Sequence, residues 1–254
     1  GCLIIACSIY YKVFSLFIFG SILLGFSQAN QQFYRYAAAD NITTKLKSKA
    51  ISLVLAGGLI AAIVGPEVSR YSFDFFPDYI YLATYLCAAL IQIFNFGILI
   101  FVEIKKPNPL KVSIRPLSKI LIRKTVIIAI LAASVGYSLM SFIMTATPLQ
   151  IVNVCKLGDS ASATVIQWHV IAMFAPSFFT GSIINLLGNR KVMMMGVILY
   201  IMSICFGIMG QTIQYFWISL FLCGLGWNFL YVGGSDIIAK SALPEERAKV
   251  QGVT

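Results

Sequence analysis

The sequence predicts an all-α, polytopic membrane protein, and two observations carry this prediction. The first is composition: 59% of the 254 residues are hydrophobic and only 11% are charged. A soluble globular protein has about 25% charged residues, so a water-soluble domain could not cover this much apolar surface. This balance excludes a soluble enzyme, a nucleic-acid-binding module and a disordered chain. The second observation is that the apolar residues gather in long uninterrupted runs.

These runs have the length of membrane-spanning helices. A helix that crosses a bilayer needs about 20 mostly apolar residues. Residues 1–10 form about half of such a run and are interpreted as the end of one span. Seven complete runs follow, at residues 13–36, 50–68, 79–102, 125–145, 162–187, 192–210 and 213–236.

The basic residues predict the orientation of these spans. Lys and Arg collect in the cytoplasmic loops of membrane proteins. Of the 19 basic residues, 16 fall in alternate connections, and only Lys12, Arg70 and Lys156 fall in the others. We therefore place the first set in the cytoplasm, in a multi-pass protein of the cell (inner) membrane. The net charge of +10 is then a topology signal, and no nucleic-acid partner is expected.

A basic linker divides the chain into two parts. Residues 103–124 carry seven cationic side chains, one anionic side chain and three prolines, and they predict a cytoplasmic linker between residues 1–102 and residues 125–254. Residues 112–122 fit either a short helix at the anionic headgroup surface or a solvated loop.

The two parts contain an internal repeat. Residues 15–20 (SLFIFG) resemble residues 219–224 (SLFLCG), and Lys49-Ala50 corresponds to Arg247-Ala248 further on. Six spans lie between the starts of the two copies, and an even number leaves both copies in the same orientation. Such a parallel repeat occurs between the halves of six-plus-six transporters. If each half has six helices, the chain runs from helix 3 to helix 10 and is incomplete at both ends.

One cytoplasmic loop carries a family signature. Residues 181–191 read GSIINLLGNRK, in which Gly181, Gly188, Arg190 and Lys191 match, while Asn185 replaces an Asp. On these residues the chain resembles the major facilitator superfamily. Gly65-Pro66 in the fifth helix resembles the Gly-Pro motif of the same family, although glycine and proline also serve plain helix packing.

The resemblance implies a two-bundle fold, with helices 3–6 in residues 1–102 and helices 7–10 in residues 125–254. It also implies that the motif residues Gly65, Pro66, Gly181, Asn185, Gly188, Arg190 and Lys191 form a conformational switch. Asp40 and Asp236 end equivalent helices, and the family often has an acidic residue there that pairs with a basic loop residue. Arg190 and Lys191 are the expected partners of Asp236.

Polar side chains within the spans are candidates for a substrate cavity, because a bilayer makes them costly. In the fourth helix Gln28, Gln31 and Arg35 form one polar stripe. The seventh, eighth and tenth helices add Tyr137, Ser141, Gln167, His169, Trp227, Asn228 and Tyr231. Aromatic rings beside amides suit a neutral or weakly charged organic molecule.

Structural alternatives stand beside these functional interpretations. Arg35 could extend to the lipid headgroups or pair with Asp40. Trp227 could serve helix packing, and His169 could be either a proton relay or a histidine bonded to the neighbouring helix.

The sequence therefore predicts a secondary transporter of a small organic molecule, which acts by alternating access, uses a gradient of protons or another ion, and is a monomer when complete. We expect no enzymatic activity, cofactor or metal site, because the single histidine and the scattered cysteines lack ligand spacing. The alternative is a seven-helix membrane receptor or sensor without transport activity.

Overall fold

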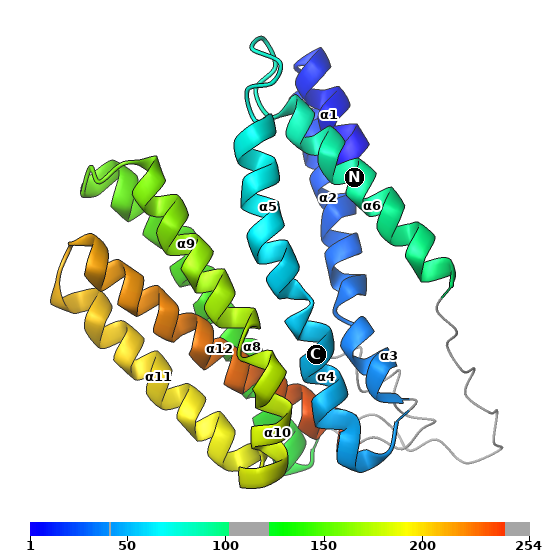
Figure 1. Cartoon of the computed structure of the whole chain (residues 1–254), viewed down its shortest axis with the longest axis vertical. Helices are drawn as coiled ribbons and strands as arrows, with labels where there is room; N and C mark the ends of the chain where they lie inside the picture. The colour runs from blue at the N-terminus through cyan, green and yellow to red at the C-terminus, as the bar shows by residue number, and fades with distance from the viewer. Residues whose placement is uncertain (41, 102–121, 242–254) are drawn as a thin grey trace. The chain divides into compact units, whose positions relative to one another are not determined.

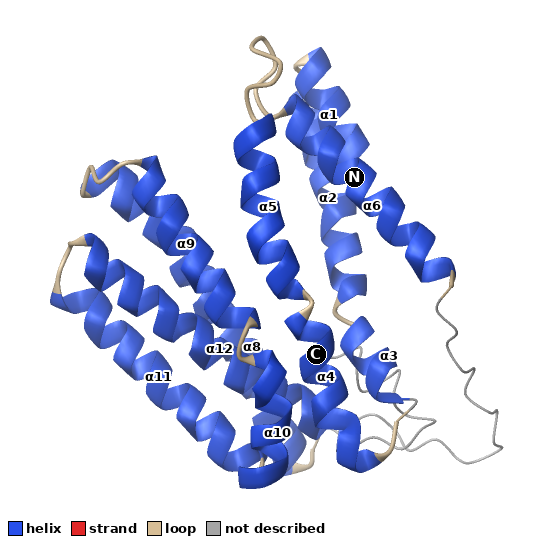
Figure 2. Cartoon of the chain, in the orientation of Figure 1, coloured by secondary structure: helices blue, strands red, loops and turns tan. Residues whose placement is uncertain are grey.

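The computed structural model describes residues 1–40, 42–101 and 122–241, and these form helices joined by short loops, with no strand among them (Figure 1, Figure 2). The prediction of an all-α fold is confirmed for this part of the chain. Most of the expected basic linker lies outside the described residues, as does nearly all of the stretch 112–122.

The helices group into two compact units. The first holds residues 1–34 and the described residues from 63 to 101, and the second holds residues 35–62 and the described residues from 122 to 241. Residues 35–62 join the second unit because they pack against its helices. The predicted division at the linker concerns the two halves of the complete protein and stays a prediction.

The first unit is built from α1 (Cys2–Tyr11), α2 (Phe14–Gln31), α6 (Leu82–Ile100) and the later part of α5 (Gly58–Ser72). Helix α1 packs against both α2 and α6. Gly20 permits the close approach of α2 to α1, because a Cβ there would lie 2.6 Å from Cγ1 of Ile5.

The second unit begins with α3 (Tyr34–Asp40), a short 3₁₀ turn (Thr44–Leu46), α4 (Lys47–Ala56) and the start of α5. It continues with α8 (Lys124–Leu149), a π-helical turn (Gln150–Val154), α9 (Asp159–Phe174), α10 (Ser177–Leu187), α11 (Asn189–Met209) and α12 (Ile213–Ser241).

Helix α12 lies at the centre of the second unit and contacts α4, α8, α9, α10 and α11. Of its most apolar stretch, 67% is buried, against 28% for the stretches in α8 and α11. Gly196 and Gly226 bring α11 and α12 together, since a Cβ on either glycine would come within about 3.0 Å of the other's carbonyl oxygen. The core around α12 includes Ile51 of α4, Ile184 of α10 and Val232.

Five helical stretches among the described residues are long and apolar enough to cross a membrane: Lys47–Ser72, Leu82–Ile100, Lys124–Val154, Asn189–Met209 and Ile213–Ser241. The pair α9 and α10, bent by 41°, would make a sixth as one broken span. These correspond to six of the seven predicted runs.

The predicted continuous span over residues 13–36 is wrong in the structure. Helix α2 ends at Gln31, and a break at Gln32 and Phe33 separates it from α3. The amide side chains of Gln28, Asn30 and Gln31 lower the hydropathy of the last turn of α2, so this helix alone is less apolar than the other spans.

Candidate functional site

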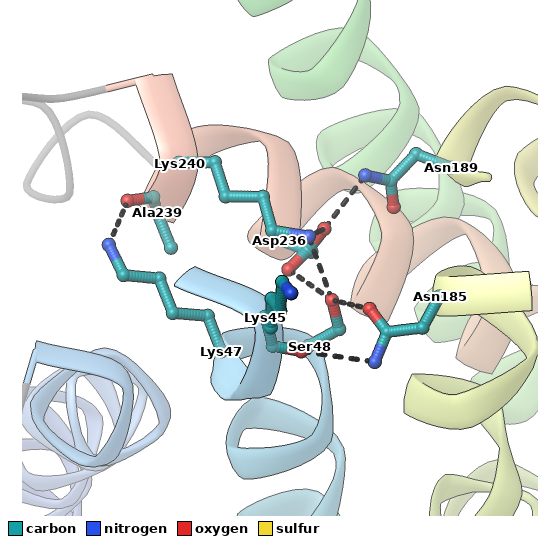
Figure 3. Close-up of polar contacts among 8 residues, drawn as sticks. All are labelled: Lys45, Lys47, Ser48, Asn185, Asn189, Asp236, Ala239 and Lys240. Carbon is teal, nitrogen blue, oxygen red and sulfur yellow. Dashed lines mark hydrogen bonds and ion pairs between the residues drawn. The ribbon is translucent and has the colours of Figure 1, made fainter. Parts of the chain in front are cut away.

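A polar network joins four helices at the end of the second unit that the sequence predicts to be cytoplasmic (Figure 3). Its centre is the carboxylate of Asp236, which is fully buried in α12. Ser48 Oγ of α4 donates to Asp236 Oδ1 at 2.7 Å, and Asn189 Nδ2 of α11 donates to Oδ2 at 2.7 Å. Lys240 Nζ forms an ion pair with the same Oδ2 at 2.7 Å and donates to Ser48 Oγ at 2.9 Å. Asn185 of α10 completes this set of five side chains, which we call the Asp236 network.

Further bonds hold α4 against α10 and α12. Ser48 Oγ lies 3.3 Å from Asn185 Oδ1, and Asn185 Nδ2 donates to the carbonyl of Lys45 at 3.2 Å. The buried ammonium of Lys47 donates to the carbonyl of Ala239 at 3.0 Å. The network therefore ties the start of α4 to residues about 140 to 190 positions later in the chain.

The partners of Asp236 differ from those expected. The structure joins its carboxylate to Lys240 and Asn189, whereas Arg190 and Lys191 are exposed at the start of α11. Lys240 lies four residues after Asp236, which places both side chains on one helix face. Asn189 is the first residue of α11, and its short amide reaches the buried carboxylate.

Gly181 of the loop signature has a packing role that the structure explains. A Cβ at this position would lie 2.6 Å from the carbonyl oxygen of Ser48 and 2.7 Å from Cα of Lys49, both backbone atoms of α4. Only glycine allows α10 to approach α4 this closely. Gly188 has a φ of +84° in the turn before α11, a conformation that favours glycine.

Two other motif residues belong to the first unit. Gly65 and Pro66 are exposed in α5, and a Cβ at Gly65 would meet no atom within 4 Å among the described residues. The side chain of Asp40 lies outside the described part of the chain.

A cluster of aromatic rings surrounds Arg35 in the same unit. We call it the ring cluster, and it consists of Arg35 and Tyr36 of α3, Tyr137 of α8, Phe174 of α9, and Trp227 and Tyr231 of α12. The rings of Trp227 and Tyr231 are stacked with centroids 4.6 Å apart. Tyr137 lies 6.4 Å from Trp227 and 6.1 Å from Tyr231, and Phe174 meets Trp227 edge-on at 5.8 Å.

The guanidinium of Arg35 contacts two of these rings. Its central carbon lies 4.1 Å from the centroid of Tyr231 and 4.6 Å from that of Tyr36, and Nη2 donates to the Tyr36 hydroxyl at 3.3 Å. The side chain is 2% exposed. Arg35 therefore does not extend toward lipid headgroups in this structure, which was one of the two structural alternatives to a role in the cavity.

Two other predicted cavity residues are bonded to neighbouring helices. His169 is fully buried, and its Nδ1 lies 2.7 Å from the carbonyl oxygen of Leu220 in α12. Asn228 donates to the carbonyl of Met173 at 2.7 Å and to Ser177 Oγ at 2.5 Å, and it accepts from Thr180 Oγ1 at 2.6 Å.

The other candidates are distributed more widely. Ser141 and Gln167 are half-buried in α8 and α9. Gln28, which is exposed, and Gln31, which is half-buried, belong to the first unit.

Sequence reasoning missed Ser48, Asn189 and Lys240 of the Asp236 network, and Tyr36 and Phe174 of the ring cluster. The spacing of Lys240 from Asp236 was a usable signal. Tyr36 directly follows its partner Arg35 in the chain, whereas Ser48, Asn189 and Phe174 lie far in sequence from their partners, so no local pattern identifies those three. Among the residues that the structure describes, no group of three or more His, Cys, Asp or Glu side chains could hold a metal ion.

The sequence is similar to a known family and to named transporters. A sequence model of the Major Facilitator Superfamily matches residues 1–254. The chain is 37% identical to the riboflavin transporter RfnT of Brucella anthropi over 253 aligned residues. The alignment covers 98% of this chain and 63% of that protein. The chain is 26% identical to the uncharacterized transporter YdeG of Bacillus subtilis over 278 aligned positions, and that alignment covers 98% of this chain and 62% of that protein.

The chain thus spans less than two thirds of the length of these relatives. No solved structure matches it. The family match extends over the complete sequence, and the relatives are named as transporters rather than enzymes. From these matches we conclude that this multi-pass, all-α membrane chain belongs to the Major Facilitator Superfamily of non-enzymatic transporters.

Proposed function

We propose that the full-length protein carries riboflavin, or a molecule with the same ring system, across the cell membrane. The observation that carries this proposal is the 37% identity, over 98% of this chain, with a protein named as a riboflavin transporter. The ring cluster agrees with it, because aromatic side chains bind planar ligands by stacking. The comparisons give no support to the receptor alternative.

The same proposal includes the mechanism expected from the sequence. The protein acts by alternating access as a monomer, and a gradient of protons or another ion drives it. The Asp236 network supports this mechanism because it links α4, from the first half of the chain, to α10, α11 and α12, from the second half. Its bonds would hold the cytoplasmic ends together in one state and break in the other.

The substrate is tested by uptake in living cells. The full-length gene is expressed in a bacterial strain that neither makes nor imports riboflavin. We expect growth on limiting riboflavin and accumulation of labelled riboflavin, both abolished when the ion gradient is collapsed. Uptake no greater than that of cells with an empty vector, with the protein present in the membrane, would overturn the proposed substrate.

We call the proposed holding of the cytoplasmic ends by the Asp236 network the latch, and it is tested with Asp236→Asn in the same cells. The substitution removes the ion pair with Lys240 and converts one carboxylate oxygen to a donor, so the network loses at least one strong bond. One such bond contributes about 1.5–3 kcal/mol, so we expect the rate of uptake to fall about tenfold, with riboflavin binding to the purified protein retained.

The matched control is Asp78→Asn, which changes an exposed carboxylate in the loop between α5 and α6. It should leave uptake unchanged. Equal rates for Asp236→Asn and the unmodified protein would exclude the latch while leaving the substrate assignment intact.

A further inference from the structure

The ring cluster differs from ordinary helix packing in its composition. Five aromatic rings and one guanidinium, from four helices distant in sequence, meet in a continuous series. Phe174 contacts Trp227, Trp227 stacks on Tyr231, and Tyr231 covers one face of the Arg35 guanidinium, which in turn lies over Tyr36. Aromatic faces beside a cation also form the kind of surface that binds planar ligands by stacking.

Two members of the cluster have unused binding capacity. Tyr137 is 41% exposed, so its ring is accessible beside the Trp227–Tyr231 stack. The indole nitrogen of Trp227 is buried, and its N–H has no acceptor among the described residues. A buried donor without an acceptor is unfavourable, and an acceptor on a bound molecule would remove that cost.

Arg35 makes the rings a cation-bearing surface. The flat guanidinium lies against Tyr231 and Tyr36 and shares the electron-rich faces of both rings. The guanidinium is 2% exposed, so its contribution is to fix the positions of these two rings.

From these features we infer that the ring cluster binds its ligand through a planar, carbonyl-bearing heteroaromatic ring. Tyr137, the exposed ring, stacks on the ring face beside the buried Trp227–Tyr231 pair, and the Trp227 N–H donates to a ring carbonyl, with Arg35 held in place by Tyr231 and Tyr36. The inference rests on the proposed function in taking riboflavin as the probe. It adds that the tricyclic ring, and not the sugar-alcohol chain, is the part recognised.

A second group of rings on α12 provides an internal control. Trp217 stacks on Phe221 at 5.2 Å and meets Trp168 edge-on at 5.8 Å. Trp217 precedes Trp227 by ten residues, or about 15 Å along the helix axis. It is the same residue type on the same helix, but no cation lies over these rings in the described part of the chain.

The test measures quenching of flavin fluorescence by the purified full-length protein. Loss of the stacking ring in Tyr137→Leu, or of the indole donor in Trp227→Leu, should weaken binding by about tenfold. Tyr137→Phe, which keeps the ring, should bind as the unmodified protein does. Trp227→Phe keeps an aromatic ring but removes the N–H. Its affinity for riboflavin should lie between that of Trp227→Leu and that of the unmodified protein. Trp217→Leu should leave binding unchanged.

Competition identifies the recognised part of the molecule. Lumichrome, which has the tricyclic ring without the sugar-alcohol chain, should displace riboflavin, and ribitol should not. If ribitol competes and lumichrome does not, the inference is overturned.

The outcomes separate this inference from the proposed function. If the unmodified protein transports riboflavin and Tyr137→Leu and Trp227→Leu bind it normally, the transporter assignment stands and the ring cluster is not the site. If the protein binds lumichrome through these residues but does not transport riboflavin, the site stands and the substrate was wrong. If the protein binds neither riboflavin nor lumichrome, both are overturned.

Discussion

Buried polar residues of the second unit separate into two kinds at the scale of single side chains. The amide of Asn228 has three protein partners, and His169 is bonded through one ring nitrogen to α12. By contrast, Nε2 of His169 and the N–H of Trp227 are buried and have no partner among the described residues. The contacts of Asn228 therefore favour helix packing, whereas Trp227 keeps the donor that we propose for the ligand and His169 keeps one unbonded nitrogen.

Asn228 stabilises the bend between α9 and α10. Pro176 has no N–H, so a carbonyl at the end of α9 loses its usual helical donor. Asn228 donates to the nearby carbonyl of Met173 and to Ser177 Oγ. Asn228→Leu leaves these groups unpaired, so we expect a loss of about 1–3 kcal/mol of stability.

This loss is measured by thermal unfolding of the full-length protein in detergent. Thr164→Ala is the control, because its hydroxyl is exposed and bonds only within α9. Equal unfolding temperatures for Asn228→Leu and Thr164→Ala would contradict the assignment.

His169 can be tested for the proton-relay role that the sequence left open. Because a carbonyl only accepts, its contact with Leu220 makes Nδ1 the protonated nitrogen. An asparagine amide can supply a donor at that position but cannot carry a proton. We therefore expect His169→Asn to keep both riboflavin uptake and its dependence on pH, whereas His169→Ala lowers the amount of folded protein. Loss of the pH dependence in a well-folded His169→Asn protein would instead identify His169 as a proton carrier.

At the scale of helices, the close contact of α4 with α10 depends on one glycine. A side chain at Gly181 would meet backbone atoms of α4, which cannot rotate away as a flexible side chain could. The Asp236 network lies at the same contact, and its bonds require this short separation between the helices.

We expect Gly181→Ala to cost about 1–3 kcal/mol of stability through overpacking, and to slow uptake by separating Ser48 from Asp236. Thermal unfolding and uptake assays measure the two effects. Gly97→Ala in α6 is the matched control, since a Cβ there meets no described atom within 4 Å. It should be neutral or slightly stabilising, because alanine suits a helix better than glycine. If both variants behave alike, the contact at Gly181 is not needed.

For the whole molecule, the distribution of Lys and Arg predicts an orientation that labelling can check. Single cysteines are placed at Thr43 and at Leu157 in a full-length protein without other cysteines. The first position lies beside the basic residues before α4, and the second is exposed in the loop before α9. In intact cells, a membrane-impermeant thiol reagent should modify the cysteine at 157, while the one at 43 reacts only after the membrane is opened. The reverse pattern would invert the predicted topology.

Much of the helical architecture was predictable because hydropathy is a local property. The runs at 79–102, 192–210 and 213–236 became α6, α11 and α12 with boundaries that differ by a few residues. The break at Gln32 and Phe33 was the exception, although the amides of Gln28, Asn30 and Gln31 already weakened that run.

The sequence by itself determined the membrane class and the family resemblance and predicts an orientation, because apolar run length, a short loop motif and loop charge are read along the chain. Of the two clusters, it identified Asp236, Asn185, Arg35, Tyr137, Trp227 and Tyr231, since polar or aromatic residues within spans are conspicuous. Only the tertiary structure decided their partners. Ser48 meets Asp236 across 188 residues, and Tyr231 covers Arg35 although the two come from opposite ends of the chain. Such pairings depend on how the helices pack. Packing is set by the fit of shapes at close contacts, such as that of Gly181 with α4, and no local pattern of residue types encodes that fit.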